Sequence, residues 1–157
     1  MRIWVTGVGI VSPLARGASA TMDRLVRGDR AFRTLTLFDL ADARCHIGAE
    51  IDGLTSDEVA PPGEAEAWSR TDAMAVYAAR EALAHAGIEP ARQPIDLIVG
   101  GTTAGMYETE ELLSRLSSDP SAIRPLTRMI AHPLSAPADH VSAAVGPFRR
   151  VRTVCSA

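Results

Sequence analysis

The side chain best suited to chemistry in this sequence is the thiol of Cys155. Residues 148–154 are expected to form a strand, because β-branched residues recur in them and Pro147 closes off the segment before. Two small residues follow the cysteine, so the strand could turn sharply there into a helix. Unpaired N–H groups and the positive end of a helix dipole favour the thiolate, which attacks carbonyl carbons. The alternative, which composition alone favours, is a buried structural cysteine.

A second candidate motif is the pair Gly7 and Gly9 in the first apolar run. Residues 2–11 are expected to form a strand covered on both faces, because their apolar side chains are nearly continuous. With Ser12, the glycines nearly satisfy the dinucleotide fingerprint, but that motif needs a helix that opens at the glycines. Here the apolar run continues and Pro13 follows at once. We expect the glycines to permit a bulge or a close backbone approach, and a dinucleotide-dependent oxidoreductase stays an alternative.

Two further groups of residues are weak candidates for binding. Cys45 and His46 are adjacent but have no second ligand pair at metal-binding spacing, so no metal site is expected. The glycine-rich residues 100–105 follow a predicted strand at 95–99 and could cradle a phosphate. They lack the Lys-Ser/Thr pair of a nucleotide-binding loop, so a structural turn is the prediction.

Predicted helices and strands alternate along the chain, which indicates a layered α/β architecture. Residues 69–86 are the clearest helix: Thr71 or Asp72 could cap it, Gly87 stops it, and its many alanines allow close packing. The other predicted elements are a short helix from Ser19 to before Gly28, a peripheral strand at 45–51, a surface loop at 55–66, a helix at 106–116, turns near 127–131 and a helix at 134–145.

The composition argues against several classes of protein. The chain has 157 residues, a net charge of −3 and two cysteines, and all of its 16 basic residues are arginine. The mild acidity argues against a nucleic-acid partner, and two cysteines cannot form a disulfide framework. With neither a signal peptide nor a membrane span in the sequence, we expect a cytoplasmic protein with no membrane partner.

Five segments resemble, in order, landmarks of the β-ketoacyl synthases, the condensing enzymes of fatty-acid and polyketide synthesis. They are residues 2–13, Arg70-Thr71-Asp72 with its alanine-rich helix, residues 96–101, residues 138–141 and Thr153-Val154-Cys155-Ser156-Ala157. The last is similar to the nucleophile motif of that family. Val154 and Asp139 depart from the commonest residues, which leaves the preferred acyl chain open.

The resemblance implies a thiolase-like α-β-α-β-α fold, a mixed sheet covered by helices, of which residues 1–157 are the amino-terminal half. It gives Cys155 the role of nucleophile that takes an acyl group from acyl carrier protein, and its backbone N–H the role of one oxyanion-hole donor. A malonyl-carrier thioester then loses carbon dioxide and condenses with that acyl group. Substrates are carried on phosphopantetheine, so no bound cofactor is expected.

The family's two catalytic histidines and lysine lie in its second half. His46, His85, His132 and His140 match none of those motifs, and we interpret His140 as structural. The carboxy-terminal half is therefore expected from a second chain or from a continuation absent here, and residues 1–157 are not expected to fold well alone.

The resemblance also implies partners. A two-fold dimer is expected through the strand from Arg149 to Val154, and the arginines of that strand could dock an acidic carrier protein. The alternative function is a non-catalytic partner subunit of the chain-length-factor type, against which the presence of Cys155 argues.

Overall fold

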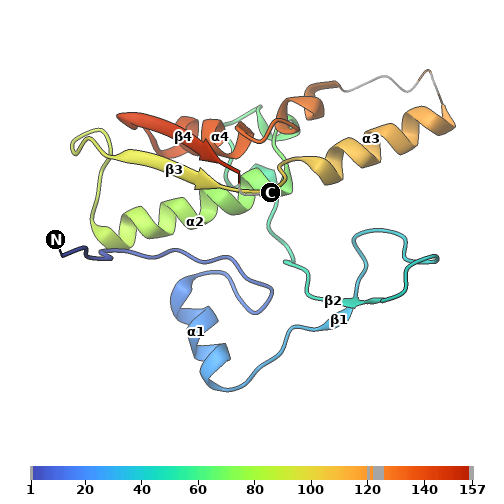
Figure 1. The fold of residues 1–157 in the computed structure, drawn as a ribbon, viewed down its shortest axis with the longest axis horizontal. Helices are drawn as coiled ribbons and strands as arrows, with labels where there is room; N and C mark the ends of the chain where they lie inside the picture. The colour runs from blue at the N-terminus through green and yellow to red at the C-terminus, as the bar shows by residue number, and fades with distance from the viewer. Residues whose placement is uncertain (1, 120, 122–125, 156–157) are drawn as a thin grey trace.

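The computed structural model describes residues 2–119, 121 and 126–155. Its elements, in chain order, are α1 (Ala18–Val26), β1 (Arg33–Thr34), β2 (Ile47–Gly48), η1 (Ser56–Glu58), η2 (Ala65–Ala67), α2 (Arg70–Ala86), β3 (Asp96–Gly100), α3 (Met106–Ser118), η3 (Leu126–Ala131), α4 (Ala136–Val145) and β4 (Arg150–Val154) (Figure 1). No helix among these residues is long and apolar enough to cross a membrane.

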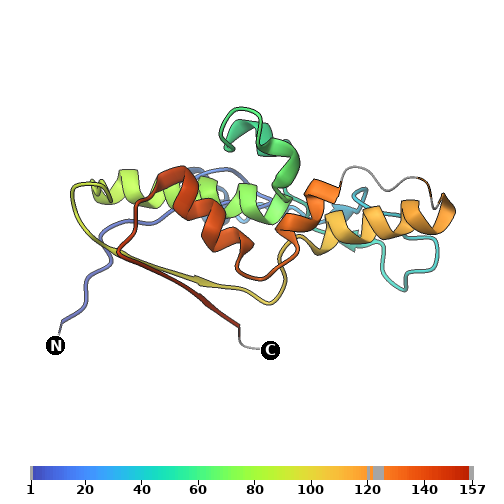
Figure 2. The ribbon, with the colours of Figure 1, turned by 90° about the horizontal axis from the view of Figure 1, so that it is seen from above.

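The longest strands of the described residues are a parallel pair, β3 and β4, in the register Asp96↔Arg150 to Gly100↔Val154. Helices α2 and α4 pack against each other and lie on the same side of this pair (Figure 2). Side chains alternate accordingly: Leu97 and Val99 are half-buried, whereas Ile98 between them is 67% exposed. One face of the strand pair is therefore covered and the other is open.

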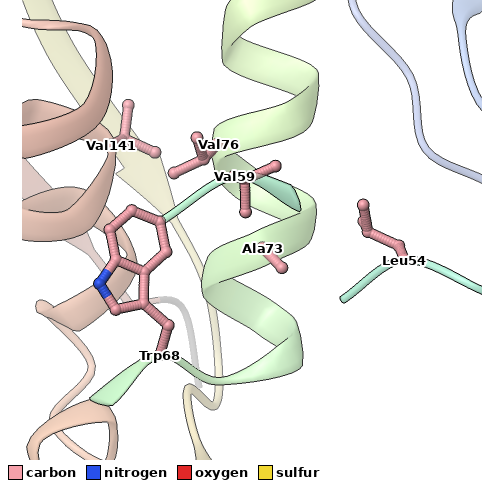
Figure 3. Close-up of a cluster of buried hydrophobic side chains, with 6 residues drawn as sticks. All are labelled: Leu54, Val59, Trp68, Ala73, Val76 and Val141. Carbon is pink, nitrogen blue, oxygen red and sulfur yellow. The ribbon is translucent and has the colours of Figure 1, made fainter. Parts of the chain in front are cut away.

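The apolar core lies where α2 and α4 meet. Figure 3 shows Val76 of α2 and Val141 of α4 beside the ring of Trp68 and the side chain of Val59. The last two residues come from the stretch around the predicted surface loop, and both are buried. The surface-loop prediction for residues 55–66 was wrong in part, because Val59, directly after η1, is a buried core residue, and Trp68 joins the core directly after η2.

Helix α2 begins one residue later than predicted, and its cap is Ser69 rather than Thr71 or Asp72. The Ser69 hydroxyl accepts from the Asp72 N–H at 3.1 Å, and the Asp72 carboxylate accepts from the Ser69 N–H at 2.7 Å. This reciprocal pair satisfies two N–H groups that a helix start otherwise leaves free. At the other end Gly87 adopts the left-handed conformation, with φ of 64°, as expected for the residue that stops a helix.

The predicted first strand is absent. Residues 2–10 have no strand pairing, and Val11 makes only an isolated bridge with Arg16. Trp4 is 77% exposed rather than covered on both faces. Figure 1 shows this segment running along α2, the element that it contacts. The prediction was wrong because an apolar run does not reveal whether a neighbouring strand is present to pair with it.

Side chains of α2 take the place of a pairing strand. The Val8 N–H donates to Nδ1 of His85 at 3.2 Å, and the Ile10 N–H donates to the Glu81 carboxylate at 2.8 Å. A Cβ on Gly9 would lie 2.0 Å from the backbone oxygen of Ala78, far inside van der Waals contact. The expected close backbone approach at the glycines is therefore confirmed, and its partner is a helix.

The peripheral strand predicted at 45–51 is shorter than expected. Only β2 forms there, and it pairs antiparallel with β1. The loop beside them is held by the buried carboxylate of Glu50, which accepts from the N–H groups of Thr36 and Leu37 at 2.7 Å each. The later predicted elements, from the helix at 106–116 to the strand before Cys155, are present with shifted ends.

Candidate functional site

Cys155 directly follows β4, at the carboxyl end of the parallel strand pair. Its thiol is free and the residue is exposed. The last backbone bond before it runs from the Gly101 N–H to the Val154 carbonyl at 3.1 Å, so the cysteine stands where ladder pairing ends. Reactive groups in open α/β sheets gather at this edge, because chain loops leave the strands there. The turn expected at residues 156–157 lies outside the described residues.

The loop after β3 reaches the same edge as Cys155. It leads from Gly101 into α3, and the Thr71 hydroxyl of α2 donates to the Ala104 carbonyl in it at 3.1 Å. The Glu108 carboxylate, nearly buried, accepts from the Arg70 N–H at 2.8 Å. The loop is thus tied to the first turn of α2, which agrees with the structural turn predicted for this stretch.

Arginines and one carboxylate surround the start of β4. The Arg149 guanidinium donates to both oxygens of Asp96, and this contact lowers the pKa of Asp96 below its ordinary value, with Arg150 and Arg152 adding to the effect. The same contact raises the pKa of Arg149. Arg150 and Arg152 lie on the open face of the strands, opposite Asp96 and Ile98 in the register. That face is therefore mixed, with cationic and apolar side chains side by side.

Strand β4 has one paired edge. It pairs with β3, and no other strand of the described residues lies beside it. An unpaired strand edge presents free N–H and C=O groups that favour pairing with another strand. The edge predicted to form a two-fold contact is thus available for it.

Three of the four histidines contact groups other than the thiol. His85 contacts the amino-terminal segment, His132 lies 3.0 Å from the Thr109 hydroxyl, and His140 lies beside Asp72. Among the described residues, no three acidic, histidine or cysteine side chains are placed to hold a metal ion. The contact between His140 and Asp72 was not foreseen from the sequence, which carries no local signal for it.

An open groove of about 340 Å³ lies away from Cys155, between α2, α3 and the β1–β2 region. Its walls are mainly apolar and include Leu37, Phe38, Met74 and Tyr107. The Tyr107 hydroxyl donates to the Leu37 carbonyl at 3.1 Å, which joins α3 to the segment between β1 and β2. Sequence reasoning missed this groove because its walls come from segments that lie far apart in the chain.

Comparison with known proteins places this geometry in context. Residues 1–157 match the family model described as "Beta-ketoacyl synthase, N-terminal domain". The tetracenomycin polyketide synthase ketoacyl synthase alpha subunit of Streptomyces glaucescens is 40% identical over 90 residues, which cover 57% of this chain and 21% of that protein.

Solved structures agree on the fold. The ishigamide ketosynthase/chain length factor superimposes with a TM-score of 0.83 at 21% identity, over 96% of this chain and 39% of that one. A type II polyketide synthase acyl-carrier protein in complex with its ketosynthase, bound to the hexaketide, matches with a TM-score of 0.59 at 17% identity, over 88% of this chain and 38% of that chain. The chain thus spans less than half of the proteins that it matches, and the predicted thiolase-like fold is confirmed.

Proposed function

The chain belongs to the β-ketoacyl synthase family, and on that premise we propose that Cys155 is the nucleophile of a ketosynthase-type condensing enzyme. The observation that carries the proposal is the exposed, free thiol at the carboxyl end of the parallel strand pair. An acyl acceptor must be open to a carrier-bound substrate, whereas a structural cysteine is ordinarily buried.

The reaction follows from thiolate chemistry. The Cys155 sulfur attacks the carbonyl carbon of an acyl thioester on acyl carrier protein, and the phosphopantetheine thiol leaves with a proton. A malonyl thioester on a second carrier then loses carbon dioxide. Its carbanion attacks the acyl-Cys155 carbonyl, a carbon–carbon bond forms, and the carbon–sulfur bond breaks to restore the thiolate.

Each addition passes through an oxyanion, which needs hydrogen-bond donors at the point where charge develops. We assign the backbone N–H of Cys155 as one donor. The second donor, and the groups that assist decarboxylation, are proposed to come from a carboxy-terminal half, supplied by a second chain or by a continuation of this one. The relatives named above make polyketide synthesis the favoured pathway, with fatty-acid synthesis as the other setting for this chemistry.

The partner surfaces follow from β4. Its free edge is proposed to pair with the same strand of a second subunit across a two-fold axis, so that the contact is isologous. Arg150 and Arg152 are exposed beside it and offer positive charge to an acidic acyl carrier protein.

The test is the formation of an acyl-enzyme in the full-length protein. Incubation with a short acyl-carrier thioester should add one acyl mass to the peptide that contains Cys155, and Cys155→Ala should abolish both this adduct and condensation. Cys45→Ala is the matched control, because Cys45 is also exposed and should be dispensable. Condensation that survives in Cys155→Ala would refute the proposal.

A non-catalytic partner of the chain-length-factor type is the second candidate. It is supported by the structural match to a ketosynthase/chain length factor assembly. Such a subunit would remain unacylated at Cys155 and would instead raise the activity of a separate ketosynthase when the two are mixed.

A further inference from the structure

A buried polar cluster lies where α2 meets α4, and the reaction proposed above does not use it. Asp72, on the first turn of α2, has no exposed surface. Its Oδ2 atom accepts from the N–H and the hydroxyl of Ser69, at 2.7 Å each. Its Oδ1 atom has no hydrogen-bond partner in the described part of the chain. Burying a carboxylate with one unpaired oxygen costs free energy unless a group close by offsets the loss of water.

His140 of α4 is that group. Its Nδ1 atom lies 3.1 Å from Oδ2 of Asp72, in a contact whose alignment is not that of a hydrogen bond. The contact is attractive when Nδ1 carries a proton, because two facing acceptors would repel each other. Only 13% of the His140 side chain is exposed. Charged and polar groups removed from water in this way interact strongly with their neighbours.

Trp68 closes the cluster from a second side. Its ring stacks on the His140 ring with centroids 4.5 Å apart and an angle of 20° between the planes. Trp68 immediately precedes Ser69, the cap of α2, so stacking and capping act on the same turn. The His140 ring is thereby held between the indole and the Asp72 carboxylate, and α4 has one defined position against α2.

A short connection and direct contacts join α4 to β4. The helix ends at Val145, the Gly146 N–H donates to the Ser142 carbonyl at 2.9 Å, and the Arg149 N–H donates to the Ile95 carbonyl at 2.8 Å. Strand β4 starts at the next residue and ends directly before Cys155. Helix α4 also packs on both strands of the pair. We therefore expect a shift of α4 to move β4 and, with it, the adjoining Cys155.

From these contacts we infer that Asp72 and His140 form a positioning pair, which fixes α4 on α2 and thereby places Cys155 for reaction. The inference rests on the proposed role of Cys155. Among the described residues, no hydrogen bond or ion pair joins either member of the pair to the thiol, so the effect passes through α4 and β4. Small displacements of a reacting atom are sufficient to reduce its rate strongly.

The experiment measures the alkylation rates of Cys155 and Cys45 by iodoacetamide in the same sample of full-length protein, with Cys45 as the internal reference. His140→Leu should lower the Cys155-to-Cys45 ratio by about fivefold, within the range of coupling through packed elements. His140→Asn keeps an N–H donor near the position of Nδ1 and should restore much of the ratio. His132→Leu is the matched control, because that histidine contacts Thr109 instead, and it should leave the ratio unchanged.

A double-mutant cycle tests the pair itself. Asp72→Asn and His140→Leu should each raise the equilibrium constant for unfolding. In the double variant the increase should be about tenfold smaller than the product of the two separate increases. If His140→Leu does not fold, the same measurements are made on Asp72→Asn and His140→Asn instead.

The outcomes separate the two hypotheses. Additive effects in the cycle, or an unchanged alkylation ratio in folded His140→Leu and Asp72→Asn, overturn the positioning pair and leave the proposed function intact. A parent protein whose Cys155 takes no acyl group contradicts the proposed function, whereas the cycle and the alkylation ratio still decide whether the pair positions that residue.

Discussion

Arg149, which directly precedes β4, donates from Nε and Nη2 to the two carboxylate oxygens of Asp96, the first residue of β3, at 2.8 and 2.9 Å. The Arg149 N–H adds a backbone bond to the Ile95 carbonyl at 2.8 Å. A two-point contact between guanidinium and carboxylate fixes orientation as well as distance. It therefore sets the register in which Gly100 faces Val154 at the far end, next to Cys155.

The first prediction concerns the acid side of stability. Because the hydrogen bonds from Arg149 lower the pKa of Asp96, the ionised carboxylate stabilises the fold above its unfolded pKa of about 4. That contribution is lost as the pH falls through the lowered folded pKa. Asp96→Asn should thus have a lower urea midpoint than the parent at pH 7. Between pH 7 and pH 3, the midpoint of the variant should fall by less than that of the parent. Asp42→Asn, at an exposed position, is the control, and an unchanged acid dependence in Asp96→Asn would contradict the prediction.

The second prediction concerns the two thiols. Both cysteines are free and exposed, yet only Cys155 stands at the end of a parallel strand. Limiting alkylation of the full-length protein should therefore modify Cys155 first, as peptide mass mapping will show, and pre-incubation with an acyl-carrier thioester should block it. Faster modification of Cys45 would end the nucleophile hypothesis.

The third prediction tests the approach of the amino-terminal segment to α2. A Cβ on Gly9 would lie 2.0 Å from the Ala78 carbonyl oxygen, a backbone atom that cannot rotate away. Gly9→Ala should destabilise the protein by about 1–3 kcal/mol, in line with overpacking at a close contact. Gly100→Ala is the control, since nothing lies within 4 Å of a Cβ there. Denaturant unfolding measures the difference, and equal stability of the two variants would show that the segment does not pack as described.

The extent to which the sequence predicted this structure differs between local and distant features. Helix α2 was predicted by its alanines and by Gly87, and β4 by its β-branched residues, because these signals lie within the elements themselves. The strand expected at residues 2–11 failed, since strand pairing depends on a partner that an apolar run does not specify. The same limit applied at the site: the place of Cys155 was predicted from its neighbours in sequence, whereas the contact of Asp72 with His140 joins two helices from different parts of the chain.

The fourth prediction concerns the free edge of β4. If this edge pairs with its own copy across a two-fold axis, a residue near the middle of the strand faces the same residue of the second subunit. In full-length protein with Cys45 and Cys155 replaced by serine, Val151→Cys or Arg152→Cys should form a disulfide-linked dimer on mild oxidation. Arg115→Cys on α3 is exposed and should remain monomeric on denaturing gels. Failure of both β4 variants to cross-link would refute the isologous contact.

The fifth prediction concerns residues 1–157 expressed alone. Ile3, Trp4 and Val5 are each more than three-quarters exposed, at 82%, 77% and 82%. Adjacent apolar side chains left in water favour association. Sedimentation and denaturant unfolding should therefore reveal oligomers or aggregates, and a monomer that unfolds cooperatively would contradict this expectation.

The two carboxylate oxygens of Glu81 also impose an order of events on synthesis. They accept the N–H groups of Ile10 and Ala18, at 2.8 and 2.7 Å, across 71 and 63 residues of chain. Ile10 and Ala18 are translated before Glu81, so their N–H groups lack this acceptor until Glu81 has left the ribosome. The segment around Ile10 therefore reaches its native place only after α2 has been made, although it precedes α2 in the chain.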